Sequence, residues 1–172
     1  MCEICDGGSE SALIRALHDR VVLHGFTMVR VEGPSPWTYT IGLSSFDHPE
    51  LVVVDTDART ATELLDKLAT LVVSGRRLQP DTFAEVQGET FGLVAVHPSR
   101  IEAGMCEMWF RFHATDPGSA QLQVLQVHLP DEYFCTCHAG SQPRLDLPGG
   151  VPGPPRRERR RQRRATKRIK RR

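Results

Sequence analysis

The sequence lacks the long apolar run that a membrane-spanning helix requires, because none of its apolar stretches reaches eighteen residues. Its first ten residues, MCEICDGGSE, are acidic and polar, and they lack the basic and apolar regions of a secretory signal peptide. The sequence also has no P-loop, no Gly-x-Ser-x-Gly elbow and no Ser-His-Asp order. We therefore expect a cytoplasmic protein with a binding function rather than an enzyme.

The five cysteines, an odd number, do not predict a disulfide framework. Two are spaced Cys-x-x-Cys near the beginning of the chain, and two more form Cys-x-Cys-His later on. Two such pairs have the donor atoms for a zinc tetrahedron if the fold brings them together. The alternative is that all of them are reduced thiols without a metal. The candidate zinc ligands are Cys2, Cys5, Cys135, Cys137 and His138.

Positive charge is scarce in most of the chain and concentrated at one end. Of the 22 basic and 21 acidic residues, residues 156–172 hold twelve basic and one acidic, which leaves a net charge of −10 for residues 1–155. A block of like charges cannot be buried, so we expect a disordered tail that binds a polyanion such as RNA or DNA. Alternatives are docking onto the acidic body, binding to an anionic membrane surface, or a localisation signal. The candidate nucleic-acid-binding residues are Arg156, Arg157, Arg159, Arg160, Arg161, Arg163, Arg164, Lys167, Arg168, Lys170, Arg171 and Arg172.

The remaining sequence predicts one folded domain, residues 1–138, joined to the tail by a proline- and glycine-rich linker, residues 139–155. Apolar residues recur at helical spacing in residues 9–24 and 58–74, and residues 99–103 have the length of one helical turn. Apolar alternation or β-branched runs predict strands at residues 26–32, 37–43, 51–54, 82–87, 91–97, 108–113 and 122–129. We therefore expect an α+β fold, with two main helices outside a mostly antiparallel, curled or barrel-like sheet.

Residues 37–50 contain a second candidate site. Threonines and a glycine share one face of the strand WTYTIGL, and polar residues follow in the next loop. A glycine in a strand marks a bulge or the close approach of a ligand or another backbone. A strand of this composition before PELVV is also loosely similar to flavin-binding split barrels. The candidate ligand-binding residues are Tyr39, Thr40, Gly42, His48 and Glu50; the alternative is that they serve only the sheet and its turn.

Several phrases taken together resemble a known family. They are MCEIC at residues 1–5, HGF at 24–26, WTYTIGL at 37–43, HPELVV at 48–53 and QLQVLQVHLPD at 121–131. In this order they are similar to a family of bacterial and phage proteins, domain-of-unknown-function family 4262. The resemblance covers about residues 1–131 and implies a bacterial or phage source, but it implies no activity. Where family members continue with a Trp-Pro-Trp-type turn, this chain has EYFCTCH at residues 132–138.

Three functional hypotheses remain. The first is a non-enzymatic protein whose tail binds RNA or DNA backbones with little sequence preference. The second is a small-molecule or cofactor binder, of flavin type or zinc-binding. The third is a phage or bacterial accessory protein that acts on a host protein.

Overall fold

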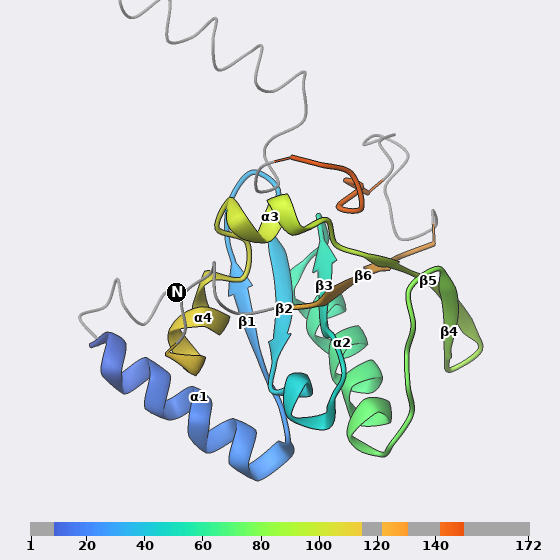
Figure 1. The fold of residues 1–172 in the computed structure, drawn as a ribbon. Coiled ribbons are helices and arrows are strands. Elements are labelled where there is room, and N and C mark those ends of the chain that lie inside the picture. Colours follow the sequence, from blue (N-terminus) through green and yellow to red (C-terminus); the bar gives the residue numbers. More distant parts are fainter. Residues whose placement is uncertain (1–8, 115–121, 131–141, 150–172) are drawn as a thin grey trace, which may run out of the picture.

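The computed structural model describes residues 9–114, 122–130 and 142–149 (Figure 1). The first helix, α1 (Glu10–His24), begins after Ser9, whose hydroxyl accepts a hydrogen bond from the Ala12 amide at 3.2 Å. It ends at Gly25, which has the left-handed φ of 83° that closes many helices. Both ends are those that the sequence predicts.

Six strands form one mixed sheet in the order β1-β2-β3-β6-β5-β4. Its pairings are antiparallel except that of β3 with β6, which is parallel. Within the described residues β1 and β4 are free edges, so the prediction of a barrel-like sheet is wrong. Alternation in a strand shows which residues share a face but not which strand lies alongside, and it therefore does not predict closure. The strands are β1 (Thr27–Val31), β2 (Trp37–Ile41), β3 (Glu50–Val54), β4 (Thr82–Val86), β5 (Glu89–Ala95) and β6 (Val124–His128).

Helices cover both faces of the sheet (Figure 1). On one face, α2 (Ala58–Val73) packs its apolar stripe against a core that includes Leu51 and Leu125. On the other face, α1 and two short helices, α3 (Pro98–Glu102) and α4 (Glu107–His113), enclose a second core. The fold is therefore of the α+β class, as predicted, with four α-helices in the described residues rather than the two main ones expected.

Helix α4 replaces the strand that was predicted at residues 108–113, which is a second correction. Met108, Phe110 and Phe112 alternate with other residues and therefore imitate a strand. However, Trp109 is also buried, so the segment has large side chains in the core on more than one face. Burial of that kind fits a short helix enclosed by its neighbours better than a two-faced strand.

Helix α2 confirms the helix predicted at residues 58–74. The Asp57 carboxylate accepts a hydrogen bond from the Thr60 amide at 3.0 Å, so Asp57 is the N-cap of the helix. The chain leaves the helix through Ser74 and Gly75.

Residues 142–149, here called the strap, lie within the predicted linker and yet pack against the folded body. The Gln142 side chain accepts from the Leu129 amide at 3.1 Å and donates to the Val54 carbonyl at 2.8 Å. The Gln126 side chain, on β6, holds the strap by accepting from the Leu145 amide at 2.8 Å. Leu145 itself is completely buried in the core beside α3 and α4.

We predict that Leu145→Ala lowers the free energy of unfolding by about 2–5 kcal/mol, the usual effect of emptying a leucine site in a core. Leu147→Ala is the matched control, because Leu147 is in the same strap but half exposed, and we expect it to leave stability nearly unchanged. Urea unfolding of both variants measures the difference. Equal stability of the two would show that the strap does not contribute to the core.

Candidate functional site

The predicted ligand-binding residues surround the point where strand β2 ends. Gly42 has a φ of 122°, and a side-chain Cβ there would lie 2.7 Å from the Gly25 carbonyl oxygen. The sequence analysis gave the close approach of another backbone as one explanation for this glycine, and the Gly25 carbonyl is that backbone. The turn also breaks the alternation of the strand, so Leu43 joins the α2 core whereas Tyr39 and Ile41 join the α4 core.

The short 3-10 helix η1 (Leu43–Phe46) follows this turn and directs its first amides at the carboxylate of Glu50. The Gly42 and Ser44 amides donate to Oε1 at 3.0 and 3.2 Å, and the Leu43 amide donates to Oε2 at 3.3 Å. The Thr40 hydroxyl donates to Oε2 at 2.7 Å, and the Trp109 indole N–H donates to Oε1 at 3.2 Å. Five donors, from the end of β2, the first turn of η1 and helix α4, therefore converge on one carboxylate.

These contacts explain how a carboxylate is kept in the core, where Glu50 is only 1% exposed. Burial raises the pKa of Glu50, while the hydrogen bonds from Thr40, Gly42, Ser44 and Trp109 act in the opposite direction. All five partners donate, which is the arrangement that suits an ionised carboxylate. The Thr40 hydroxyl also accepts from the Leu51 amide at 2.9 Å, so its own proton is directed at Glu50.

His48 is fixed in the same way by backbone groups. Its Nδ1 lies 2.7 Å from the Pro49 carbonyl oxygen, and its Nε2 accepts from the Leu78 amide at 3.0 Å. The ring is therefore neutral, with its proton on Nδ1, and both nitrogens have partners. Burial lowers the pKa of His48, with the nearby Arg77 charge acting in the same direction.

Tyr39 connects strand β2 to helix α4, on the face of the sheet opposite helix α2. Its hydroxyl oxygen accepts from the Met108 amide at 3.2 Å, next to the buried thiol of Cys106. Burial raises the pKa of both Tyr39 and Cys106, which keeps them protonated. The structure thus gives Tyr39, Thr40, Gly42, His48 and Glu50 structural contacts, and a ligand-binding role for them stays a prediction.

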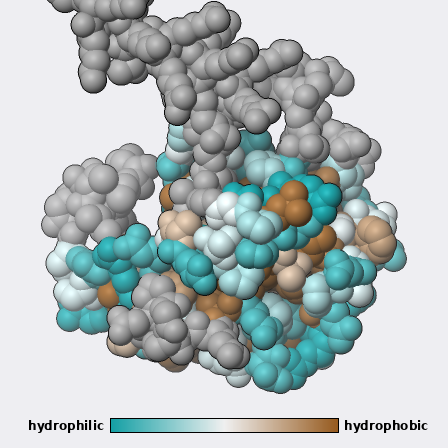
Figure 2. Space-filling model, turned by 45° about the horizontal axis from the view of Figure 1, so that its top comes forward, coloured by the Kyte–Doolittle hydropathy of each residue, from teal (hydrophilic) through white to brown (hydrophobic). Residues whose placement is uncertain are grey.

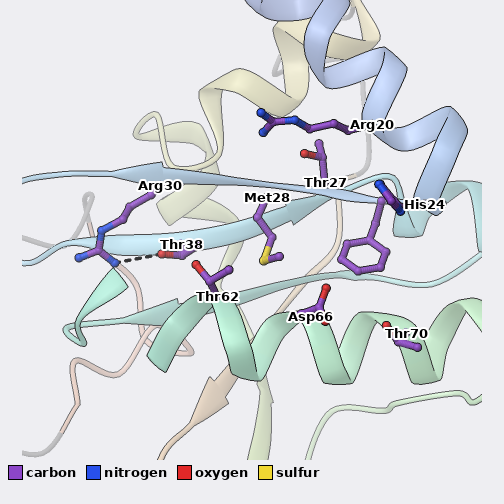
Figure 3. A pocket seen from close by; sticks show the side chains of 10 residues that line it. Arg20, His24, Thr27, Met28, Arg30, Thr38, Thr62, Asp66 and Thr70 are labelled. Atoms are coloured by element: carbon purple, nitrogen blue, oxygen red, sulfur yellow. Dashed lines mark hydrogen bonds between the residues drawn. The ribbon is translucent and has the colours of Figure 1, made fainter. Parts of the chain in front are cut away.

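A pocket of about 540 Å³ lies elsewhere, along edge strand β1 (Figure 3). Helix α1 contributes Arg20 and His24, and helix α2 contributes Asp66 and two threonines. Sequence reasoning missed these residues, because they come from segments that become neighbours only in the fold. The one local signal was the spacing of Arg20 and His24, which are one helical turn apart.

Residues 20–133 match the family model described as Domain of unknown function (DUF4262). The chain belongs to this family. The match confirms the resemblance found in the sequence, and it contains the Glu50 cluster and all ten lining residues of the pocket. No curated protein and no solved structure matches the chain.

The DUF4262 match ends before the strap, so this core element lies beyond the matched residues. The candidate zinc ligands Cys2, Cys5, Cys135, Cys137 and His138, and the basic residues 156–172, lie outside the described residues. Among the residues that are described, no group of three or more His, Cys, Asp or Glu side chains is placed to hold a metal. None of the described helices is long and apolar enough to cross a membrane.

We predict that Glu50→Gln lowers the free energy of unfolding by about 2–4 kcal/mol, because the new amide nitrogen would face buried donors that lose their acceptor. The control is Glu63→Gln on α2, where the carboxylate is 54% exposed and pairs with Arg59. Denaturant unfolding measures both. If the two changes had the same effect, the carboxylate at residue 50 would not be required for the turn.

The lowered pKa of His48 predicts a dependence of stability on pH. An unfolded histidine binds a proton near pH 6.5, whereas the folded ring binds one only at lower pH. Its contribution is therefore complete above about pH 6.5 and is lost as the pH falls below that value.

Unfolding free energies of the wild type and of His48→Gln, measured between pH 5 and pH 7.5, test this. We expect the unfolding free energy of the variant to fall less on acidification than that of the wild type. His113 and His128, whose pKa values burial also lowers, are present in both proteins, so their contributions cancel. The raised pKa of Glu50 makes stability fall as the pH rises, which is the opposite direction. Glu50 is present in both proteins, so its contribution cancels as well. Parallel curves would contradict the assignment.

Proposed function

We propose that this DUF4262 protein binds RNA or DNA backbones through residues 156–172. We further propose that its folded domain anchors the chain shortly before this basic segment. The observation that supports the proposal is the charge distribution: twelve Lys and Arg residues in seventeen positions, against a net charge of −10 in residues 1–155. Dense positive charge binds phosphates with release of counterions, and arginine also binds them through paired hydrogen bonds.

The composition of the segment limits what it recognises. It contains no aromatic residue, so it has no side chain on which bases stack. We therefore expect binding to depend on the phosphate backbone, with little preference for base sequence. The acidic body repels the same polyanion, which keeps the association reversible.

The strap supports the proposal by anchoring the chain just before the basic segment. The Ser99 hydroxyl accepts from the Gly149 amide at 3.0 Å, and the Arg100 guanidinium donates to the Leu147 and Arg144 carbonyls at 3.1 Å each. Gly149 is thus attached to α3, and Arg156 follows seven positions later. An extended chain of that length reaches about 25 Å at most.

The visible face of the folded body mixes hydrophobic and hydrophilic side chains. Between the grey segments in Figure 2, hydrophobic side chains appear on the visible face as separate groups among hydrophilic ones.

We predict that the full chain binds fluorescent RNA and duplex DNA and that affinity falls steeply with added salt. A chain that ends at Gly149 keeps the strap and is expected to lose this binding. Fluorescence anisotropy titrations at several salt concentrations measure both. Equal binding by the shortened chain, or binding that does not respond to salt, would overturn the proposal.

A triple change inside the segment gives a graded version of this test. Replacing Arg159, Arg160 and Arg161 by glutamine removes three charges, which should make the log–log salt dependence for duplex DNA shallower by about 2.7. The control is Arg59→Gln, which removes an exposed charge from α2. It should leave the salt dependence as in the wild type.

A further inference from the structure

The pocket beside β1 exists because helix α2 does not extend over the edge of the sheet. Helix α2 contacts β2 and β3, so the side of β1 that faces α2 is only partly covered. Met28 lies on this side (Figure 3). Together with Phe26, which comes just before β1, it gives the pocket an apolar floor. The volume of about 540 Å³ falls within the range of small-molecule sites.

One wall of the pocket carries positive charge that is available to a ligand. Arg20 and His24 are exposed and lie one turn apart on α1, so their side chains share a helix face. Among the residues that the structure describes, neither side chain has a hydrogen bond or an ion pair. An anionic group is the natural partner for this pair.

The other arginine of the pocket is already occupied. Arg30 donates from Nε to the Glu32 carboxylate at 2.6 Å, from Nη1 to the Thr38 hydroxyl at 3.1 Å and from Nη2 to the Thr56 carbonyl at 3.2 Å. Its charge is balanced and its side chain is fixed. Arg30 therefore forms one end of the pocket, and Arg20 is the arginine that remains for a ligand.

The opposite wall consists of neutral and acidic oxygen groups. Thr62, Asp66 and Thr70 are spaced four residues apart on α2, so they form one stripe along the pocket (Figure 3). Hydroxyl groups of a ligand can donate to the Asp66 carboxylate and exchange hydrogen bonds with the threonines. The carboxylate also disfavours a second anion, which places the negative group of a ligand on the α1 side.

We propose that this pocket binds a small phosphate ester with a hydroxylated body, namely a sugar phosphate or a nucleotide. The phosphate contacts Arg20 and His24, and the sugar hydroxyls face Thr62, Asp66 and Thr70. The apolar floor of Phe26 and Met28 takes the sugar ring or a base. This site is separate from the basic segment and does not depend on nucleic-acid binding.

Isothermal titration calorimetry of the full chain at about 150 mM salt, which screens distant charges, tests the proposal. The probes are adenosine 5′-monophosphate and ribose 5-phosphate, each compared with its phosphate-free form, adenosine or ribose. We expect the phosphate esters to bind and the phosphate-free forms to bind much more weakly. Tighter binding of the nucleotide than of the sugar phosphate would place a base on the apolar floor, and equal binding would make the sugar phosphate the ligand class.

Two variants assign the contacts. Arg20→Gln should raise the Kd for adenosine 5′-monophosphate about tenfold or more, since it removes a charged hydrogen bond. Arg15→Gln is the matched control, because Arg15 is exposed on the same helix but does not line the pocket. Asp66→Asn should weaken binding of adenosine 5′-monophosphate. Inorganic phosphate, titrated as a further probe, should bind this variant as weakly as it binds the wild type.

Any phosphate bound by the basic segment is the same in all of these variants. Equal titrations of Arg20→Gln and Arg15→Gln would therefore assign binding to that segment and overturn the proposal. The absence of saturable binding, or adenosine bound as tightly as its monophosphate, would overturn it as well.

Discussion

The buried carboxylate of Glu50 is the interaction on which the arrangement of the chain depends. A charge in the core is tolerated only when donors replace the water it has lost, and here they come from the end of β2, the first turn of η1 and the indole of α4. The need to satisfy one side chain thus fixes a sharp turn, the start of a helix and the docking of a second helix across the sheet. Gly42 is part of this constraint, because its amide is a donor and its missing side chain lets the Gly25 carbonyl approach.

Local patterns in the sequence predicted most of the elements, whereas contacts between distant residues explain the failures. Ser9 and Gly25 act within their own helix, so the limits of α1 follow from the sequence alone. The pairing of β6 with β3 is set by both cores together, and no local pattern encodes it. Within the candidate site, the sequence predicts the histidine and glutamate of HPELVV as candidate ligand-binding residues. It does not predict their partners, because backbone amides of a turn leave no signature in composition. The pocket was missed for the related reason that its two walls belong to different helices.

Four buried polar side chains in this domain share one use. Those of His48, Glu50, Gln126 and Gln142 all bond to backbone groups of another segment, and each ends a strand, holds a turn or attaches the strap. These four side chains therefore serve the architecture of the fold, whereas Trp37 Nε1, Ser44 Oγ and His113 Nε2 are buried without a hydrogen-bond partner among the described residues. Arg20 and His24 differ from these four side chains, because they are exposed on α1 beside the pocket and have no partner among the described residues.

The parallel pairing of β3 with β6 also has a kinetic consequence. Glu50 faces Val124 in the register, although 74 positions separate them in the chain. The central pair of the sheet therefore forms only after a long loop has closed. Loop closure costs conformational entropy before the contacts that offset this cost can form. Sheets with such distant pairings fold slowly compared with helical bundles of equal size. Until β6 arrives, β3 and β5 each expose an open hydrogen-bonding edge, and this intermediate stage is where the chain is most exposed to pairing with a second copy of itself.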